Sequence, residues 1–237
     1  MTQCRECGGL CCYADDSTYT VQGSGPDELS EKLSQKYSAL ADFLTANKLK
    51  VNDEKTHLLV MSTRQKRRHR DASTIIINTH TAIITPSQVE RLLGAQVHQD
   101  MHWKEHLLDS DDSPLKSLKK RTGAIKKISK DASFKTRKMI ANGIFMSKPI
   151  YLMPVWMGCE DYLVNALQVN MNKVARLVTK LDIFTPTSVL LHQCVWMSVK
   201  QLMAYHSIVL LHKTLKNQTP SYLFQKISSR SEQYNTR

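Results

Sequence analysis

Two adjacent carboxylates, Asp15 and Asp16, lie between two short stretches of β-prone residues. Tyr13 and Ala14 precede them, and Ser17–Val21 follows. Mg²⁺ prefers oxygen ligands in octahedral geometry and usually retains substrate phosphates and waters as its other ligands. In two-metal phosphoryl transfer, carboxylates hold the ions that stabilise the attacking and leaving oxygens. The pattern therefore predicts a hairpin that presents Asp15 and Asp16 to a divalent metal ion.

The elements around this pair suggest a mixed first part of the chain. Cys11–Val21 is expected to form the two strands, and Gly23–Pro26 then breaks the chain before a helix over Asp27–Asn47. The apolar residues of this helix recur at helical spacing, which predicts that it covers one face of a sheet. They are Leu29, Leu33, Tyr37, Leu40 and Leu44. Further strands are expected at Leu58–Met61, Thr74–Asn78, Thr81–Thr85 and Arg91–Val97, the last with a glycine inside it.

After Trp103 the periodicity becomes helical. Helices are expected over Leu115–Lys130, Ser133–Met146, Glu160–Leu181 and Ser198–Leu215. The predicted fold class is therefore α+β, with a mixed domain at 1–103, an all-helical domain at 104–225 and a flexible tail at 226–237. Trp156 and Trp196 are interpreted as core residues.

Charge points to a polyanionic partner. The 237 residues include 33 Lys+Arg and 21 Asp+Glu, a formal net charge of +12, which favours nucleic acid over a membrane. The sequence shows no signal peptide and no apolar stretch long enough to span a bilayer. We therefore expect an intracellular protein, nuclear or cytoplasmic, that is not secreted and has no membrane partner.

Four cysteines gather near the start of the chain, at Cys4, Cys7, Cys11 and Cys12. Cys4 and Cys7 have zinc-ligand spacing, but a structural zinc site needs a second well-spaced pair. Cys11 and Cys12 are adjacent, so on a strand their side chains would point to opposite faces. Reduced thiols are the favoured interpretation, and zinc is the alternative.

The order of these sequence motifs resembles the order found in a known protein family. Tyr13-Ala14-Asp15-Asp16 is similar to the catalytic motif of reverse transcriptases from non-LTR, or LINE-type, retrotransposons. The run from Asn47 to Thr56 is similar to the family's joint between a helix and a strand. Leu93-Gly94, followed by Trp103 and His106, resembles the next family landmark. The helical half, with Tyr151–Trp156 and Thr185-Pro186, resembles the family's thumb and its extension.

The resemblance implies a role for each matched residue. Asp15 and Asp16 would be catalytic ligands of Mg²⁺, and Lys55 would stabilise the departing pyrophosphate. Tyr13 and Ala14 would support the nucleotide or the primer end, with Leu93 and Gly94 in the primer grip. The implied partners are an RNA template, a DNA primer and a dNTP, and the implied reaction is RNA-directed DNA synthesis by a nucleotidyltransferase.

The family also requires a third metal-binding aspartate on a strand upstream of the hairpin, and fingers that hold the template. Only 12 residues precede Tyr13, and none of them is Asp. Without that carboxylate, two metal ions cannot be held in the geometry that the reaction requires. We therefore expect a truncated copy, consisting of the end of the palm and the thumb, that is inactive by itself.

A cluster of basic residues on the predicted helix Leu115–Lys130 could follow a phosphate backbone. Its members are Lys116, Lys119, Lys120, Arg121, Lys126, Lys127 and Lys130, of which positions 116, 119, 120, 127 and 130 roughly share one side. A polymerase thumb grips its duplex with such a helix, whereas the simplest alternative is a solvated helix face. Two functional alternatives to a polymerase fragment therefore remain open. One is a non-catalytic nucleic-acid-binding module, and the other is an inert remnant of a decayed element.

Overall fold

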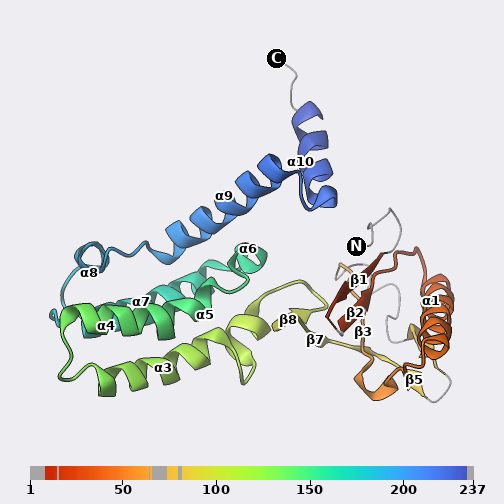
Figure 1. The fold of residues 1–237 in the computed structure, drawn as a ribbon, viewed down its shortest axis with the longest axis horizontal. Coiled ribbons are helices and arrows are strands. Elements are labelled where there is room, and N and C mark those ends of the chain that lie inside the picture. Colours follow the sequence, from red (N-terminus) through yellow and green to blue (C-terminus); the bar gives the residue numbers. More distant parts are fainter. Residues whose placement is uncertain (1–8, 15, 64, 66–73, 80–81, 234–237) are drawn as a thin grey trace. The chain divides into compact units, whose positions relative to one another are not determined.

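The computed structural model describes residues 9–14, 16–63, 65, 74–79 and 82–233, which form a mixed α+β fold (Figure 1). The chain divides into two compact units. Unit 1 comprises Met1–Leu92 and His98–Met101, and unit 2 comprises Leu93–Val97 and His102–Arg237. The division falls within a hairpin, close to the boundary predicted near Trp103.

Unit 1 contains the short strands and one long helix. Its elements are β1 (Leu10–Tyr13), β2 (Asp16–Tyr19), α1 (Pro26–Ala46), the 3₁₀ turn η1 (Asp53–Lys55), β3 (Leu58–Leu59), β4 (Ile77–Asn78), β5 (Ile83–Ile84), β6 (Pro86–Ser87) and β7 (Val89–Leu92). Among the described residues, strands pair two at a time: β1 with β2, β3 with β6, β4 with β5, and β7 with β8 (Ala95–His98). The β3–β6 pair is parallel.

Helix α1 covers the strands as its apolar spacing predicts. Pro26 occupies its first turn, where a missing backbone N–H has no consequence. Its residues Leu29, Leu33 and Tyr37 pack on a small core formed by Leu58, Ile75, Ile77 and Ile84. The Tyr37 hydroxyl donates a hydrogen bond to Asp53 Oδ1, which ties η1 to the helix.

Unit 2 is helical. Its elements are the π-helical turn η3 (Glu105–Asp109), α3 (Pro114–Ile128), α4 (Phe134–Ile140), the π-helical segment η4 (Ala141–Met146), α5 (Ser147–Ile150), α6 (Met153–Trp156), α7 (Asp161–Thr179), α8 (Thr187–Cys194), α9 (Val199–Asn217) and α10 (Ser221–Gln233). The helices predicted from the sequence are therefore present, with shifted ends. Residues 226–233, predicted as part of a flexible tail, belong to α10.

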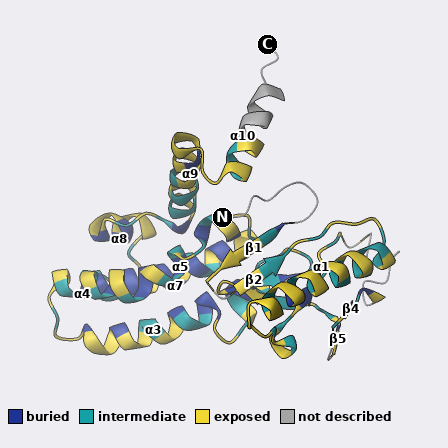
Figure 2. Cartoon of the chain, turned by 45° about the vertical axis from the view of Figure 1, so that its right-hand side comes forward, coloured by how far each residue is buried: buried dark blue, intermediate teal, exposed yellow. Residues whose placement is uncertain are grey.

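Helix α7 carries the centre of the core in unit 2. Leu163, Leu167, Met171, Val174 and Val178 are all buried, as their spacing predicts. They join residues of η3, α3, η4 and α8 in one apolar cluster, visible as the buried sides of these helices in Figure 2. Trp156 is buried in this cluster, which confirms it as a core residue, whereas Trp196 is partly buried and packs against the cluster.

One strand prediction is wrong. Arg91–Val97 is not a single strand, because the chain reverses at Leu93 and Gly94 between β7 and β8. Both residues have positive φ values, 47° and 83°. Two such residues form the tight two-residue turn whose twist suits a hairpin, so the glycine marks a reversal and not a bulge.

No single helix among the described residues is both long and apolar enough to cross a membrane. Helices α8 and α9 meet these criteria only together, and they are bent by 49° relative to each other.

Candidate functional site

The predicted hairpin is present. Strands β1 and β2 pair antiparallel, with Tyr13 opposite Asp16. Ala14 has a φ of 52°, in the left-handed region that a two-residue hairpin turn requires. Tyr13 is 68% exposed, and Ala14 and Asp16 are exposed as well. Asp15, one of the two predicted metal ligands, lies outside the described residues.

A magnesium site is not complete in the described part of this hairpin. In the described part of the hairpin, Leu10–Ala14 and Asp16–Tyr19, Asp16 is the one residue with a carboxylate side chain. This side chain is exposed to solvent. Mg²⁺ bound by a single exposed carboxylate would have to take its remaining ligands from water or from a substrate. The described residues of this hairpin therefore do not fit a two-metal centre by themselves.

The other predicted polymerase residues lie on separate elements. Lys55 ends η1 in unit 1 and is exposed. Among the described residues, no hydrogen bond or ion pair joins Lys55 to Asp16. Leu93 and Gly94 form the turn between β7 and β8 and belong to unit 2. The Leu93 carbonyl oxygen there accepts a hydrogen bond of 2.7 Å from the hydroxyl of Tyr151.

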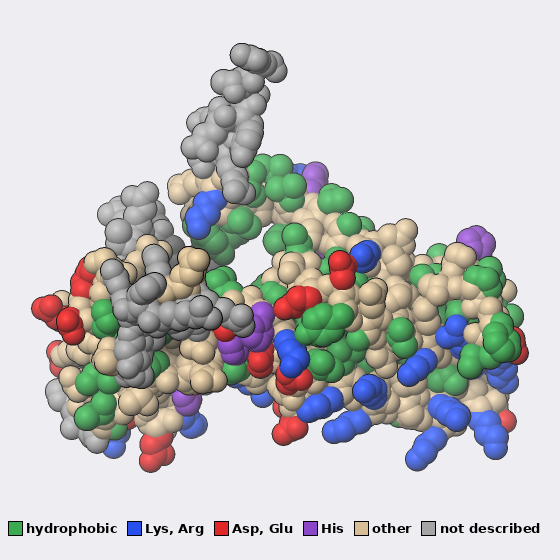
Figure 3. All heavy atoms as spheres, turned by 180° about the vertical axis from the view of Figure 1, so that it is seen from behind, with side chains coloured by type: hydrophobic (Ala, Val, Ile, Leu, Met, Phe, Trp, Pro, Cys, Tyr) green, Lys and Arg blue, Asp and Glu red, His purple; other side chains and the backbone are tan. Residues whose placement is uncertain are grey.

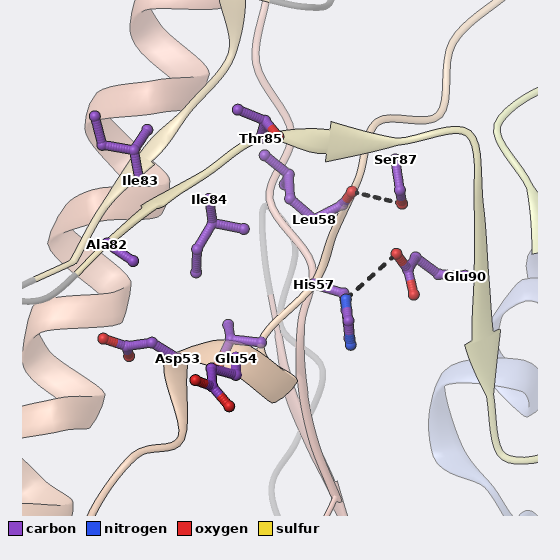
Figure 4. Close-up of a pocket in the computed structure, with 11 residues that line it drawn as sticks. Asp53, Glu54, His57, Leu58, Ala82, Ile83, Ile84, Thr85, Ser87 and Glu90 are labelled. Carbon is purple, nitrogen blue, oxygen red and sulfur yellow. Dashed lines mark hydrogen bonds and ion pairs between the residues drawn. The ribbon is translucent and has the colours of Figure 1, made fainter.

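A hollow of about 460 Å³ lies in unit 1 (Figure 4). Its lining includes Asp53, Glu54 and Glu90, while Ile83 and Ile84 contribute apolar surface. His57 Nδ1 lies 3.5 Å from Glu90 Oε1. Three carboxylates repel a phosphate backbone, so this hollow is not a nucleic-acid site.

The strip His98–Glu105 also contains residue types that bind metals. His98 Nδ1 accepts a 3.0 Å hydrogen bond from the Asp100 backbone and lies 3.8 Å from an oxygen of the same aspartate. His102 Nδ1 lies 2.8 Å from Glu105 Oε2. The division between the units falls between Asp100 and His102, and each histidine has an acidic neighbour within its own unit.

Helix α3 brings most of the predicted basic cluster together. The helix begins with Ser113, whose hydroxyl caps the backbone N–H of Lys116 at 3.4 Å, and with Pro114 in its first turn. Leu115, Leu118 and Ile125 are buried against the core. At about 100° per residue, the five lysines of α3 fall on a single sector about 120° wide, beside that buried side. With Lys130, which lies two residues beyond the end of the helix, they form the α3 lysine face: Lys116, Lys119, Lys120, Lys126, Lys127 and Lys130.

The lysine face is open and uniformly positive. Lys119, Lys120, Lys126, Lys127 and Lys130 are all exposed, and α3 contains no acidic residue. Basic side chains follow the edge of the helical unit in Figure 3. Lys116, at the N-terminal end, is held by the Asp109 carbonyl oxygen at 2.7 Å and lies 3.5 Å from Asp111. Four lysines of α3 therefore remain directed at solvent along about 12 Å of helix, and Lys130 is exposed just beyond its end.

Two features extend this face. Lys180, the residue after α7, donates from Nζ to the Lys130 carbonyl oxygen at 3.3 Å and adds a cation at the end of α3. Gly123 lies near the centre of the lysine sector, and beyond its neighbours in the chain and the nearby backbone of α3, no atom of the described residues lies within 4 Å of the position that a Cβ would take. An incoming backbone can therefore approach the helix closely between the lysines.

Arg121 lies on a different side of α3 from these lysines. Its Nε donates to Ser117 Oγ at 3.2 Å, and its Nη1 donates to the Ile144 carbonyl oxygen in η4. Arg121 thus fastens α3 to η4 and is directed away from the lysine face. The basic cluster named from the sequence includes Arg121, but the side that positions 116, 119, 120, 127 and 130 share does not.

Sequence reasoning missed the link between Tyr151 and the turn at Leu93, because the two residues are far apart in the chain. Cys11 and Cys12 carry free thiols and are exposed, whereas Cys4 and Cys7 lie outside the described residues.

No protein-family model matches this chain, and no curated protein or solved structure matches it either.

Proposed function

We propose that the chain binds a nucleic-acid duplex through the α3 lysine face, as a fragment related to LINE-type reverse transcriptases in which the helical unit serves as the thumb. The observation that carries this proposal is the gathering of five lysines on one side of α3, which has no acidic residue, with Lys130 exposed just beyond its end. The resemblance of the sequence to that family is the reason to choose nucleic acid over other polyanions.

The face suits a duplex better than a single strand. Sites for single strands combine positive charge with aromatic rings on which bases stack. The stretch from Pro114 to Lys130 contains no aromatic residue. A row of lysines contacts phosphates and carries no sequence information, so the binding is expected to be independent of sequence. The hybrid of an RNA template and a DNA primer is the duplex that the resemblance implies.

The proposal assigns binding and not catalysis to this chain. Asp16 is a single exposed carboxylate in the described part of the hairpin, and it carries no metal centre alone. If the chain does polymerise DNA, the metal ligands would be Asp15 and Asp16 with Mg²⁺, as in the related family. Primer extension with Mg²⁺ and a dNTP mixture tests this separately from binding.

The experiment compares two variants of equal charge change on a fluorescent RNA–DNA hybrid. One carries Lys119→Gln, Lys126→Gln and Lys130→Gln, on the lysine face. The control carries Lys36→Gln, Lys213→Gln and Lys216→Gln, which are exposed residues of α1 and α9. Since each lost phosphate contact removes counterion release, the first variant should bind about tenfold more weakly or worse. The control should bind close to the wild-type chain.

Equal losses in both variants would mean that net charge alone drives association, and the α3 face would not be a site. Absence of binding by the wild-type chain at low salt would leave the inert remnant as the correct interpretation. Tighter binding of a single strand of equal length would contradict the choice of a duplex.

A further inference from the structure

His106 is a buried titratable residue that the α3 lysine face does not use. It lies at the start of η3 and is only 5% exposed. Its ring stands edge-on to that of Trp103, with the ring centroids 6.1 Å apart and the ring planes at 73°. A histidine held away from water in this way remains neutral more readily than a solvated one, because burial disfavours the charged form.

The hydrogen bond that His106 makes requires the neutral ring. Its Nδ1 accepts from the backbone N–H of Gln96 in β8, at 3.3 Å. A ring nitrogen that accepts carries no proton, so the proton of the neutral ring lies on Nε2. Nε2 is itself buried and has no hydrogen-bond partner among the described residues. Within that part of the chain, the bond to Gln96 is thus the polar contact that fixes the ring.

The stretch that contains Gln96 is fastened at a second point. The Tyr151 hydroxyl donates to the Leu93 carbonyl oxygen at 2.7 Å, and the Tyr151 ring lies 3.5 Å from the position that a Cβ on Gly94 would take. His106, Tyr151 and the stretch Leu93–Val97 all belong to unit 2. Leu93–Val97 therefore rests on the helical unit through two side chains. One of them is a histidine, the residue type whose charge changes most readily near neutral pH.

Among the described residues, none of the charged groups near His106 stabilises a protonated ring. The cations on the surrounding helices are Lys148 of α5 and Lys116 of α3, which is held at the Asp109 carbonyl oxygen. The carboxylates of η3 itself are already paired, Glu105 with His102 at 2.8 Å and Asp109 with Lys104 at 3.1 Å. Burial first, and then the charge of Lys148, lower the pKa of His106 below its ordinary value.

We propose that His106 is a pH-dependent latch: the neutral ring fastens Leu93–Val97 to the helical unit, and the protonated ring releases this stretch. Protonation turns Nδ1 from an acceptor into a donor that faces the N–H of Gln96, so the bond between them is lost. It also places a charge in a buried site near Lys148. Because the folded pKa of His106 lies below the unfolded value, the stability from this bond is fully present above about pH 6.5. It is lost as the pH falls through the folded pKa.

Nuclear magnetic resonance of the full chain tests the latch, because it follows the His106 ring and the Gln96 amide in one sample. Between about pH 7 and about pH 4.5 the Gln96 amide should lose about tenfold of its protection against hydrogen exchange, since one hydrogen bond is lost. This comparison is made after correction for the pH dependence of the exchange chemistry. The Val174 amide in the core of α7 should keep its protection. The midpoint of the change at Gln96 should coincide with that of the titrating His106 ring.

Two variants separate the latch from a general effect of acid. His106→Gln keeps a side-chain oxygen that can accept but does not titrate, so the protection of Gln96 should no longer depend on pH. His102→Gln, a matched change of the neighbouring histidine, should keep the wild-type response. A wild-type Gln96 amide that stays equally protected throughout this range would overturn the proposal. So would a change that persists in His106→Gln, or one whose midpoint differs from that of the His106 ring.

Discussion

The buried guanidinium of Arg137 in α4 donates a hydrogen bond from Nε to the carbonyl oxygen of Val178, 2.8 Å away in the last turn of α7. Its Nη1 also donates to the Ala132 carbonyl oxygen, just before α4 begins. The last carbonyls of a helix have no partner within the helix, and a cation there also interacts favourably with the helix dipole. One side chain thus closes the end of α7 and fixes the start of α4 against it.

Replacing Arg137 with Ala should therefore destabilise unit 2. The change leaves two carbonyl oxygens without a donor, and each loss costs about 1–3 kcal/mol. We expect the free energy of unfolding to fall by about 2–4 kcal/mol in urea denaturation followed by circular dichroism. Lys135→Ala, on the exposed side of the same helix, should change it by less than about 0.5 kcal/mol. A similar small change for Arg137→Ala would show that its hydrogen bonds do not support the fold.

Two glycines should respond to alanine in opposite directions. Gly94 has a φ of 83° in the β7–β8 turn, so Gly94→Ala should cost about 1 kcal/mol of stability. Gly123 lies inside α3 with open space around its Cβ position, so Gly123→Ala should gain about 0.5–1 kcal/mol. Thermal unfolding of both variants measures the two shifts. Stabilisation by Gly94→Ala would argue against the tight turn.

Unit 1 should lose stability at high pH through Tyr37. Burial and the adjacent carboxylate of Asp53 raise the pKa of Tyr37 to about 12. The folded pKa exceeds the value of about 10 for an unfolded tyrosine. The stability that the protonated Tyr37 hydroxyl contributes is therefore fully present below pH 10, and it is lost between pH 10 and 12. Denaturation of wild type and Tyr37→Phe across this range measures it. The difference in stability between the two should shrink as the pH rises, and a constant difference would contradict the assigned pKa.

Local patterns predicted the elements well and the long-range contacts poorly. The β1–β2 hairpin, helix α1 and the buried side of α7 follow from turn residues and apolar spacing, which depend on neighbours in the chain. The β7–β8 hairpin was missed because Leu93, a residue that seldom adopts a positive φ, occupies half of its turn. The hydrogen bond from Arg121 to Ile144 in η4 was not foreseen because the two residues are distant in sequence. Tyr151 was not linked to Leu93 for the same reason.

The central claim is that the α3 lysine face binds duplex phosphates, and the salt dependence of affinity tests it most directly. Five exposed lysines predict that log K falls with log salt concentration at a slope of about −4.5 on a B-form duplex. In the Lys119→Gln, Lys126→Gln, Lys130→Gln variant the slope should move to about −1.8, because three phosphate contacts are lost. A slope near zero for the wild-type chain, or an unchanged slope in this variant, would contradict the assignment of nucleic-acid binding to α3.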